Sequence, residues 1–328
     1  MSSIFVFQMP NMKITFSLIL TFCVAVAFGQ KERTIAFYNV ENLFDTIDGV
    51  NDDAEFLPAG KNKWNAQRYT EKIQHINQVI SALEFPLIMG FCEVENKHVI
   101  QDVLSFNKKL KKYGIVHYDS PDARGIDVGM IYDKKLLTEV ASGKLRFILP
   151  GQTEPSTRDI VWAKFKSKKD TVFCIVNHWP SRRSGQDESE PSRIKAAETA
   201  RLFIDSVLAA QPTAKIVFMG DLNDHPSDLA PKKIAERLVP MIAKSSGVYG
   251  GTHNYKDEWD VLDHIMVSNG FLTGSGMKAI SSSGKIHSFE FLITEYKGKM
   301  VPFRTYAGSN YLGGYSDHLP VSMRISLP

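Results

Sequence analysis

Short apolar runs rich in β-branched and aromatic residues recur along the chain and predict β-strands. The predicted strands are Thr34–Asn39, Leu87–Cys92, Val128–Tyr132, Ile160–Phe165, Thr171–Asn177, Ile216–Met219, His264–Val267 and Leu319–Ile325. Several of them are apolar along most of their length instead of alternating with polar residues. This pattern predicts that they are buried on both faces.

Apolar residues also recur at helical spacing between some of these strands. Tyr69, Ile73, Ile76, Ile80 and Leu83 form one stripe, and a second includes Ile194, Ala197, Leu202 and Phe203. The chain is therefore predicted to be mixed α/β, with two packed sheets covered by helices. No linker-like stretch or fixed-period repeat divides residues 30–328, so we expect one domain there.

Four stretches are rich in Gly, Ser, Asn and charged residues, and each lies beside a strand that has polar residues at its end. They are Asp48–Asn62, Ser181–Pro191, Ser245–Asn254 and Ala307–Tyr315. We expect them to form the rim of a cleft.

The first 29 residues have the features of a secretory signal peptide. Lys13 precedes an apolar run from Ile14 to Phe28, and Gly29 follows as a small residue at the expected cleavage site. The run is short for a membrane span and is followed at once by polar residues, so we expect cleavage and not a retained anchor. The sequence thus predicts a secreted or periplasmic protein without a stable membrane span.

Composition adds little about function. The chain has 328 residues, of which 43% are hydrophobic and 23% charged, as in ordinary globular proteins. Its net charge of +3 is too small to indicate a nucleic-acid partner. Of the three cysteines, Cys92 and Cys174 follow the signal segment inside apolar runs, where we expect two free, buried thiols.

Polar side chains stand where the apolar strands stop. Any one of them has an ordinary structural explanation, because Asn and Asp favour turns and most histidines are bystanders. Six strand ends that all carry such residues are harder to explain in that way. These residues are Asn39, Glu93, His178, Asp221 with Asn223, Asp263, and Asp317 with His318.

Attack of water on a phosphate ester requires these residue types. A hard cation binds oxygen ligands such as Glu93, often with water and phosphate oxygens in its remaining positions. A histidine oriented by a carboxylate can accept the proton of the attacking water. Cationic side chains then offset the charge on the phosphoryl group.

In this ordered set the chain resembles the endonuclease/exonuclease/phosphatase superfamily, which has the deoxyribonuclease I-like fold. The most specific segments are Gly220-Asp221-Leu222-Asn223 and Ser316-Asp317-His318, and the resemblance spans Thr34 to Leu327. It implies a four-layered α/β sandwich, with two mixed β-sheets packed face to face and helices outside.

The resemblance also implies roles for individual residues. Glu93 is expected to be the principal metal ligand, with Asn39 and Asp317 near the ion, which is Mg²⁺ by default or Mn²⁺. His318 is expected to be the general base, held by Asp263, although members of this fold differ on whether aspartate or histidine takes the proton.

Further residues are expected to position the phosphate or the nucleophile. These are Asp221, Asn223 and His178, with Asp127 as the orienting partner of His178, and Arg158 as a phosphate-binding arginine. Arg182, in the basic loop after His178, is a further candidate for gripping phosphate.

The resemblance predicts a phosphodiesterase but not its substrate. We expect an extracellular nuclease, with nucleic acid as substrate, ahead of an enzyme acting on phospholipids or small phosphodiesters. Lys108, Lys109, Lys111 and Lys112 are expected to be a solvated helix face. The alternative from another class is a non-catalytic binding module, but none of the expected site positions is replaced.

Overall fold

Two mixed β-sheets form the centre of the computed structural model, which describes residues 1, 3, 31–168 and 170–328. The predicted signal peptide lies almost entirely outside the described residues. The first sheet has the order β13 (Lys278–Ala279), β19 (Val321–Leu327), β1 (Lys31–Leu43), β2 (Ile88–Val94), β4 (Asp127–Asp133) and β3 (Tyr113–His117), and β14 (Lys285–Ile286) also pairs with β19. The second has the order β5 (Thr138–Leu145), β6 (Ile160–Ser167), β7 (Asp170–His178), β8 (Lys215–Asp221), β12 (Asp263–Ser268) and β9 (Leu238–Pro240).

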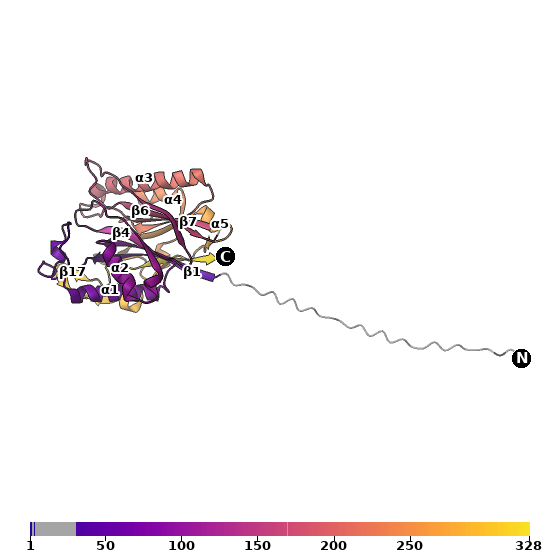
Figure 1. Cartoon of the computed structure of the whole chain (residues 1–328), viewed down its shortest axis with the longest axis horizontal. Coiled ribbons are helices and arrows are strands. Elements are labelled where there is room, and N and C mark those ends of the chain that lie inside the picture. The colour runs from indigo at the N-terminus through magenta and orange to yellow at the C-terminus, as the bar shows by residue number, and fades with distance from the viewer. Residues whose placement is uncertain (2, 4–30, 169) are drawn as a thin grey trace. The chain divides into compact units, whose positions relative to one another are not determined.

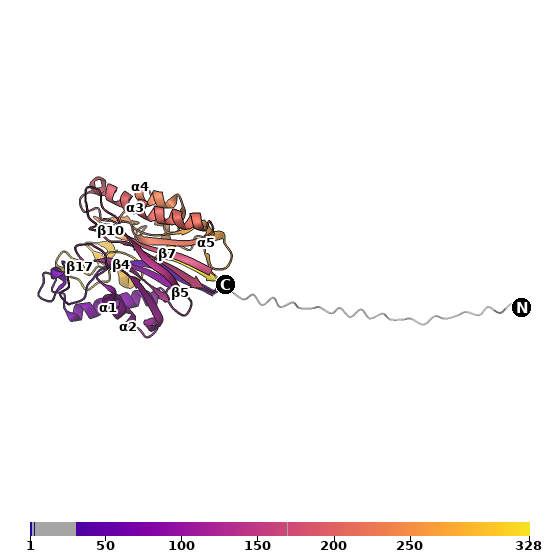
Figure 2. The same cartoon turned by 45° about the horizontal axis from the view of Figure 1, so that its top comes forward.

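Helices cover the outer face of each sheet, as Figures 1 and 2 show. α1 (Ala66–Ala82) and α2 (Lys97–Phe106) pack on the first sheet, and α3 (Gln186–Ala210) and α4 (Leu229–Ala235) pack on the second. The short α5 (Asn269–Thr273) follows β12. The predicted four-layered α/β sandwich is therefore confirmed for residues Lys31–Pro328, which form one compact unit.

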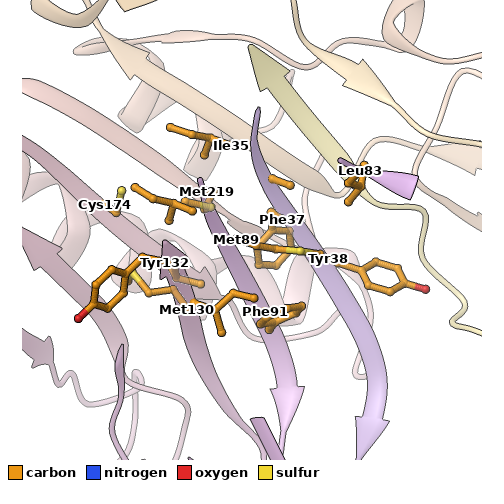
Figure 3. Packing of buried hydrophobic residues seen from close by; sticks show 14 of the residues in the cluster. Ile35, Phe37, Tyr38, Leu83, Met89, Phe91, Met130, Tyr132, Cys174 and Met219 are labelled. Carbon is orange, nitrogen blue, oxygen red and sulfur yellow. The ribbon is translucent and has the colours of Figure 1, made fainter. Parts of the chain in front are cut away.

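The core between the sheets explains why these strands are apolar on both faces. Figure 3 shows side chains of β1, β2 and β4 next to Met219 of β8 and Cys174 of β7. Their opposite faces pack on the helices, as Ile175 and Phe218 do under α3. Cys92 and Cys174 are buried and unpaired, as expected.

Both long helices of the first layer begin at an asparagine cap. Asn65 accepts hydrogen bonds from the backbone N–H groups of Gln67 and Arg68, and Asn96 caps α2 in the same way. The predicted apolar stripe of α1 is confirmed, since Ile73, Ile76 and Ile80 are buried.

Three predictions of local structure are wrong. Ser181–Pro191 is not all loop, because α3 begins at Gln186 and includes Pro191 within its second turn. Leu202 is 72% exposed and so lies off the buried face of α3. The lysine-rich segment forms only a 3₁₀ turn, Leu110–Lys112, instead of an α-helix.

Short polar elements connect the main strands. They are the hairpins β10–β11 (His253–Tyr255, Glu258–Asp260), β15–β16 (Ile293–Tyr296, Lys299–Pro302) and β17–β18 (Tyr306–Ala307, Asn310–Tyr311), with 3₁₀ turns at Ala54–Phe56, Lys244–Ser246 and Glu290–Leu292. Two of these hairpins lie between β14 and β19, in a region with no long apolar run. Within the described residues, no helix has the length and apolar character needed to cross a membrane.

Candidate active site

Strand direction brings the polar strand ends to one edge of the molecule. β1 runs parallel to β2, and β7 runs parallel to β8, so their carboxyl ends meet there. β12 and β19 run antiparallel to these strands and begin at the same edge. In the second sheet Asp221 is in register with both His178 and Asp263, which places three predicted site residues side by side.

Glu93, Asp221 and His178 approach one another around the amide of Asn39. The Asn39 Nδ2 group lies 3.0 Å from Oδ2 of Asp221 and 3.4 Å from Oε1 of Glu93. Nε2 of His178 lies 3.8 Å from each of these two carboxylate oxygens. The structure thus brings together four residues that come from four different strands.

The donor set fits a hard divalent cation. Glu93 is more accessible than Asp221, since 16% of the Glu93 side chain is exposed and only 2% of the Asp221 side chain. Its Oε2 accepts a hydrogen bond from the backbone N–H of Asn42, which fixes the carboxylate. The Asn39 amide turns its Nδ2 group toward these carboxylates, while its Oδ1 accepts the backbone N–H of Glu41. Glu93 is therefore the residue that offers a ligand oxygen, and Mg²⁺ often takes one carboxylate with water in its remaining positions.

Asp317, the third predicted metal ligand, lies in a different environment. Arg304 binds its carboxylate, and its neighbours include His253 and His318, with ligand atoms of the three residues within 4.8 Å of one another. Burial opposes ionisation of Asp317, but the charges of His318 and Arg304 hold its pKa below the usual range. Its role as a ligand remains a prediction.

His318 and Asp263 form a buried, hydrogen-bonded pair. Nδ1 of His318 lies 2.7 Å from Oδ2 of Asp263, and Nε2 faces Oδ2 of Asp221 at 3.7 Å. Burial alone would lower the pKa of His318, but the carboxylates of Asp263 and Asp221 outweigh it and raise that pKa well above the ordinary value. The proton on this imidazole is therefore strongly held.

The pKa of Asp221 is raised as well, but for a carboxylate this favours the neutral form. Burial raises its pKa to about 7, against the lowering effect of His318. The N–H of Asn223 donates to Oδ1 of Asp221, which orients the group, and the Asn223 side chain donates to the carbonyl of Trp179. A carboxylate with a pKa near neutrality can exchange a proton at physiological pH.

His178 is held as a neutral imidazole. Burial, with the nearby guanidinium groups of Arg158 and Arg124, keeps its pKa well below the ordinary range. Its Nδ1 is buried and has no hydrogen-bond partner among the described residues. The ring therefore presents Nε2 to the site without a carboxylate behind it.

The predicted pairing of Asp127 with His178 is wrong. Asp127 instead lies with Oδ2 3.1 Å from Nε2 of His117, and its Oδ1 accepts the N–H of Ser120. The reason is strand register: His117 pairs with Gly129, whose Cα faces the same side of β4 as that of Asp127. The carboxylate therefore turns toward β3.

The two predicted phosphate-binding arginines already have protein partners. Arg158 is buried and donates to Oδ2 of Asp122 at 2.9 Å and to the carbonyl of Trp179 at 2.8 Å. Arg182 lies 3.2 Å from Nε2 of His225 and 3.4 Å from Oδ2 of Asp260. Arg158 thus supports the loop after β7, and its positive charge lowers the pKa of His178.

Sequence reasoning missed two cationic residues near the site. Arg124, with 42% of its side chain exposed, pairs loosely with Asp122, and its charge lowers the pKa of His178. Arg304 binds Asp317. Neither belongs to a strand-end motif, so only their place in the fold identifies them.

Several site residues have a backbone conformation that is rare outside glycine. Glu93 and Asn223 have φ angles of 60° and 51°, and Glu41 and Asn42 have 51° and 54°. This left-handed conformation costs about 1 kcal/mol or more per residue and persists only where the surroundings enforce it. The register shift near the end of β2 and the turn after β8 thus aim Glu93 and Asn223 at the expense of local stability.

Comparison with known proteins gives a family and a fold. A model described as the endonuclease/exonuclease/phosphatase family matches residues 34–326. No curated protein sequence matches the chain.

Solved structures share the fold at low sequence identity. The human nocturnin catalytic domain with bound sulfate is 14% identical, with 90% of this chain and 95% of that chain covered and a TM-score of 0.57. A mannosyl-6-phosphatase of Bacteroides thetaiotaomicron is 15% identical, with 89% and 99% covered and a TM-score of 0.56. D. rerio TDP2 complexed with single strand DNA product is 12% identical, with 90% and 98% covered and a TM-score of 0.55.

Proposed function

This chain belongs to the endonuclease/exonuclease/phosphatase family, and on that basis we propose that it is a divalent-metal-dependent hydrolase of phosphate esters. The observation that carries the proposal is the convergence of Glu93, Asp221 and His178 with the buried His318–Asp263 pair. Members of this family are hydrolases of phosphate esters, and each residue type that water attack on phosphorus needs is present at the site.

The side chains of the site suggest a division of roles. Glu93, with Asn39 beside it, would hold a Mg²⁺ or Mn²⁺ ion. When bound, such an ion offsets negative charge on the phosphoryl oxygens. Neutral His178 can donate a hydrogen bond to a phosphate oxygen.

Proton transfer is proposed to involve Asp221. Its pKa of about 7 allows it to accept the proton of the attacking water at neutral pH. The protonated His318, stabilised by Asp263, would then offset the charge that develops on the phosphoryl group. The sequence-based prediction gave the role of base to His318, but its raised pKa favours Asp221.

The site residues support a type of reaction, but the fold itself does not identify the substrate class. Similar structures include one with a DNA product and one of a sugar phosphatase, so the shared fold is compatible with both classes. The expected nuclease would need a basic surface for a strand. Around this site, Arg158, Arg182 and Arg304 are each engaged by a carboxylate of the described residues. This favours an ester smaller than a nucleic-acid strand.

We also propose export, on the strength of the sequence features of residues 1–29. Cleavage after Gly29 would place Gln30 at the amino terminus, one residue before β1 begins. Amino-terminal sequencing of the protein from medium or periplasm tests this proposal. An intact signal segment there would contradict it.

A substrate panel with and without EDTA tests the catalytic proposal. The panel contains p-nitrophenyl phosphate, bis(p-nitrophenyl) phosphate, DNA, RNA and phospholipid, each assayed with Mg²⁺ or Mn²⁺. We expect hydrolysis of at least one ester, loss of activity with EDTA, and recovery when metal is added back. No hydrolysis of any member by folded protein would favour a binding module instead.

A further inference from the structure

A pocket of about 670 Å³ lies beside the catalytic residues. Its walls come from the β15–β16 and β17–β18 hairpins and from the turn of the β10–β11 hairpin. Its lining includes Asp317, the neighbour of His318 in sequence. The volume is within the range of pockets that bind small molecules.

Two contacts tie the pocket to the catalytic pair. His253 forms a backbone bridge with His318, and the centroids of their two rings are 4.8 Å apart. Asn254, the next residue of β10, lines the pocket. A phosphate ester bound at His318 can therefore extend its alcohol part into this space.

The charges of the lining disfavour a second phosphate. Lys256 and Arg304 are its cations, and its anions are Asp257, Glu295 and Asp317. Asp257 also pairs with Lys299 at 2.7 Å, so the pocket offers no excess of positive charge. Arg304 is already bound to Asp317. A nucleic-acid strand, which carries one phosphate per nucleotide, would find no basic surface here.

The remaining lining is apolar and aromatic with two amides. Tyr296, Phe303 and Leu312 offer rings and an aliphatic side chain, and Asn254 and Asn310 offer hydrogen bonds. This is a surface for a compact, uncharged group that has hydroxyl groups and an apolar face.

We propose that this pocket binds the alcohol part of the substrate and selects esters whose alcohol is compact and neutral, such as a sugar or glycerol. The proposal rests on the proposed phosphate ester hydrolysis and names its substrate class.

Competitive inhibition of the chromogenic hydrolysis established by the panel tests this assignment. The inhibitors are inorganic phosphate, hexose 6-phosphate, glycerol 3-phosphate, hexose 1,6-bisphosphate and a thymidine dinucleotide with a 5′-phosphate. Hexose 6-phosphate or glycerol 3-phosphate, whichever binds more tightly, should have an inhibition constant about tenfold below that of inorganic phosphate. Comparison of the hexose and glycerol esters shows whether the pocket prefers a sugar or glycerol as the alcohol part.

The second phosphate of the bisphosphate should weaken inhibition about tenfold relative to hexose 6-phosphate, because the pocket has no excess of positive charge to offset its removal from water. For inorganic phosphate and the tighter-binding of hexose 6-phosphate and glycerol 3-phosphate, the advantage of the ester is the ratio of the two inhibition constants. Leu312→Arg should reduce this advantage about tenfold. The matched control is Leu202→Arg, at an exposed leucine on α3, which should leave that advantage unchanged.

The outcomes separate the two proposals. No hydrolysis of the chromogenic esters by folded protein overturns the proposed function. Hydrolysis with equal inhibition by inorganic phosphate, hexose 6-phosphate and glycerol 3-phosphate overturns the pocket assignment alone. Tighter inhibition by the dinucleotide than by hexose 6-phosphate and glycerol 3-phosphate overturns the pocket assignment in favour of a nucleic-acid strand.

Discussion

Replacing Asp263 by Asn tests the electrostatic core of the site. Asp263 is fully buried, and its Oδ2 lies 2.7 Å from Nδ1 of His318. Asn has the same shape and can still hold the ring, so the change removes mainly the charge. We expect kcat to fall while KM changes little, because the charge stabilises the imidazolium form of His318 in the transition state.

The size of the effect follows from the geometry of the pair. Two unit charges about 4 Å apart interact by about 4 kcal/mol at an effective dielectric constant of about 20. Since about 1.4 kcal/mol corresponds to a factor of ten in rate, kcat should fall about 10³-fold.

The pH profile separates this role from that of a general base. Asp263 raises the pKa of His318. Its removal should therefore move the alkaline limb of the kcat profile to lower pH, because the imidazolium is then lost earlier as pH rises. Steady-state assays across pH, with thermal melts to confirm folding, measure both effects.

The control for this variant is Asp205→Asn, which changes a partly exposed carboxylate on α3 that pairs with Arg201 and Arg237. It should leave kcat unchanged. The reasoning is refuted if folded Asp263→Asn protein retains more than about a tenth of the wild-type kcat. A shift of the acid limb instead would return the role of base to His318.

Other variants address the metal, the histidine and acid stability. Glu93→Gln should raise the Mg²⁺ concentration for half-maximal activity at least about tenfold, as measured by metal titration, because a carboxylate ligand is lost; an unchanged titration would contradict the assignment. His318→Ala should lower kcat about 10³-fold or more without a comparable fall in melting temperature, and near-normal turnover would exclude it from catalysis. Burial lowers the pKa of His287 from 6.5 to about 4, so protonation favours the unfolded chain and stability is lost as pH falls from 6.5 toward 4. At pH 5 this amounts to about 2 kcal/mol, and denaturant melts of His287→Gln should lose less stability between pH 7 and pH 5 than the wild type; equal losses would count against this account.

The layered fold was predictable because its strands are apolar enough to be recognised from the local sequence alone. The site residues were predictable only as a set: one polar residue at the end of an apolar strand, such as Asn39 or His178, has an ordinary structural explanation, but six such strand ends together do not. Parallel and antiparallel pairing then brings those ends together. The strands and their polar ends follow from the apolar pattern, whereas the four-layered arrangement and the roles of the residues were implied by the resemblance to the family.

The features that could not be predicted from the sequence depend on contacts between distant segments. Asp127 turns toward His117 because of the β3–β4 register, which no local pattern encodes. Arg158 is engaged by Asp122 of another loop. The hairpins that form the pocket are short and polar, so their strands carry almost no apolar signal.

The pairing of β1 with β19 has a consequence for the timing of activity. β1 is the first strand of the described fold and β19 the last, and β19 begins three residues after His318. Until this distant partner docks, the imidazole has no fixed place beside Asp263. A nascent or partly folded chain is thus inert, and recovery of hydrolysis during refolding would report the closure of the most distant strand pair.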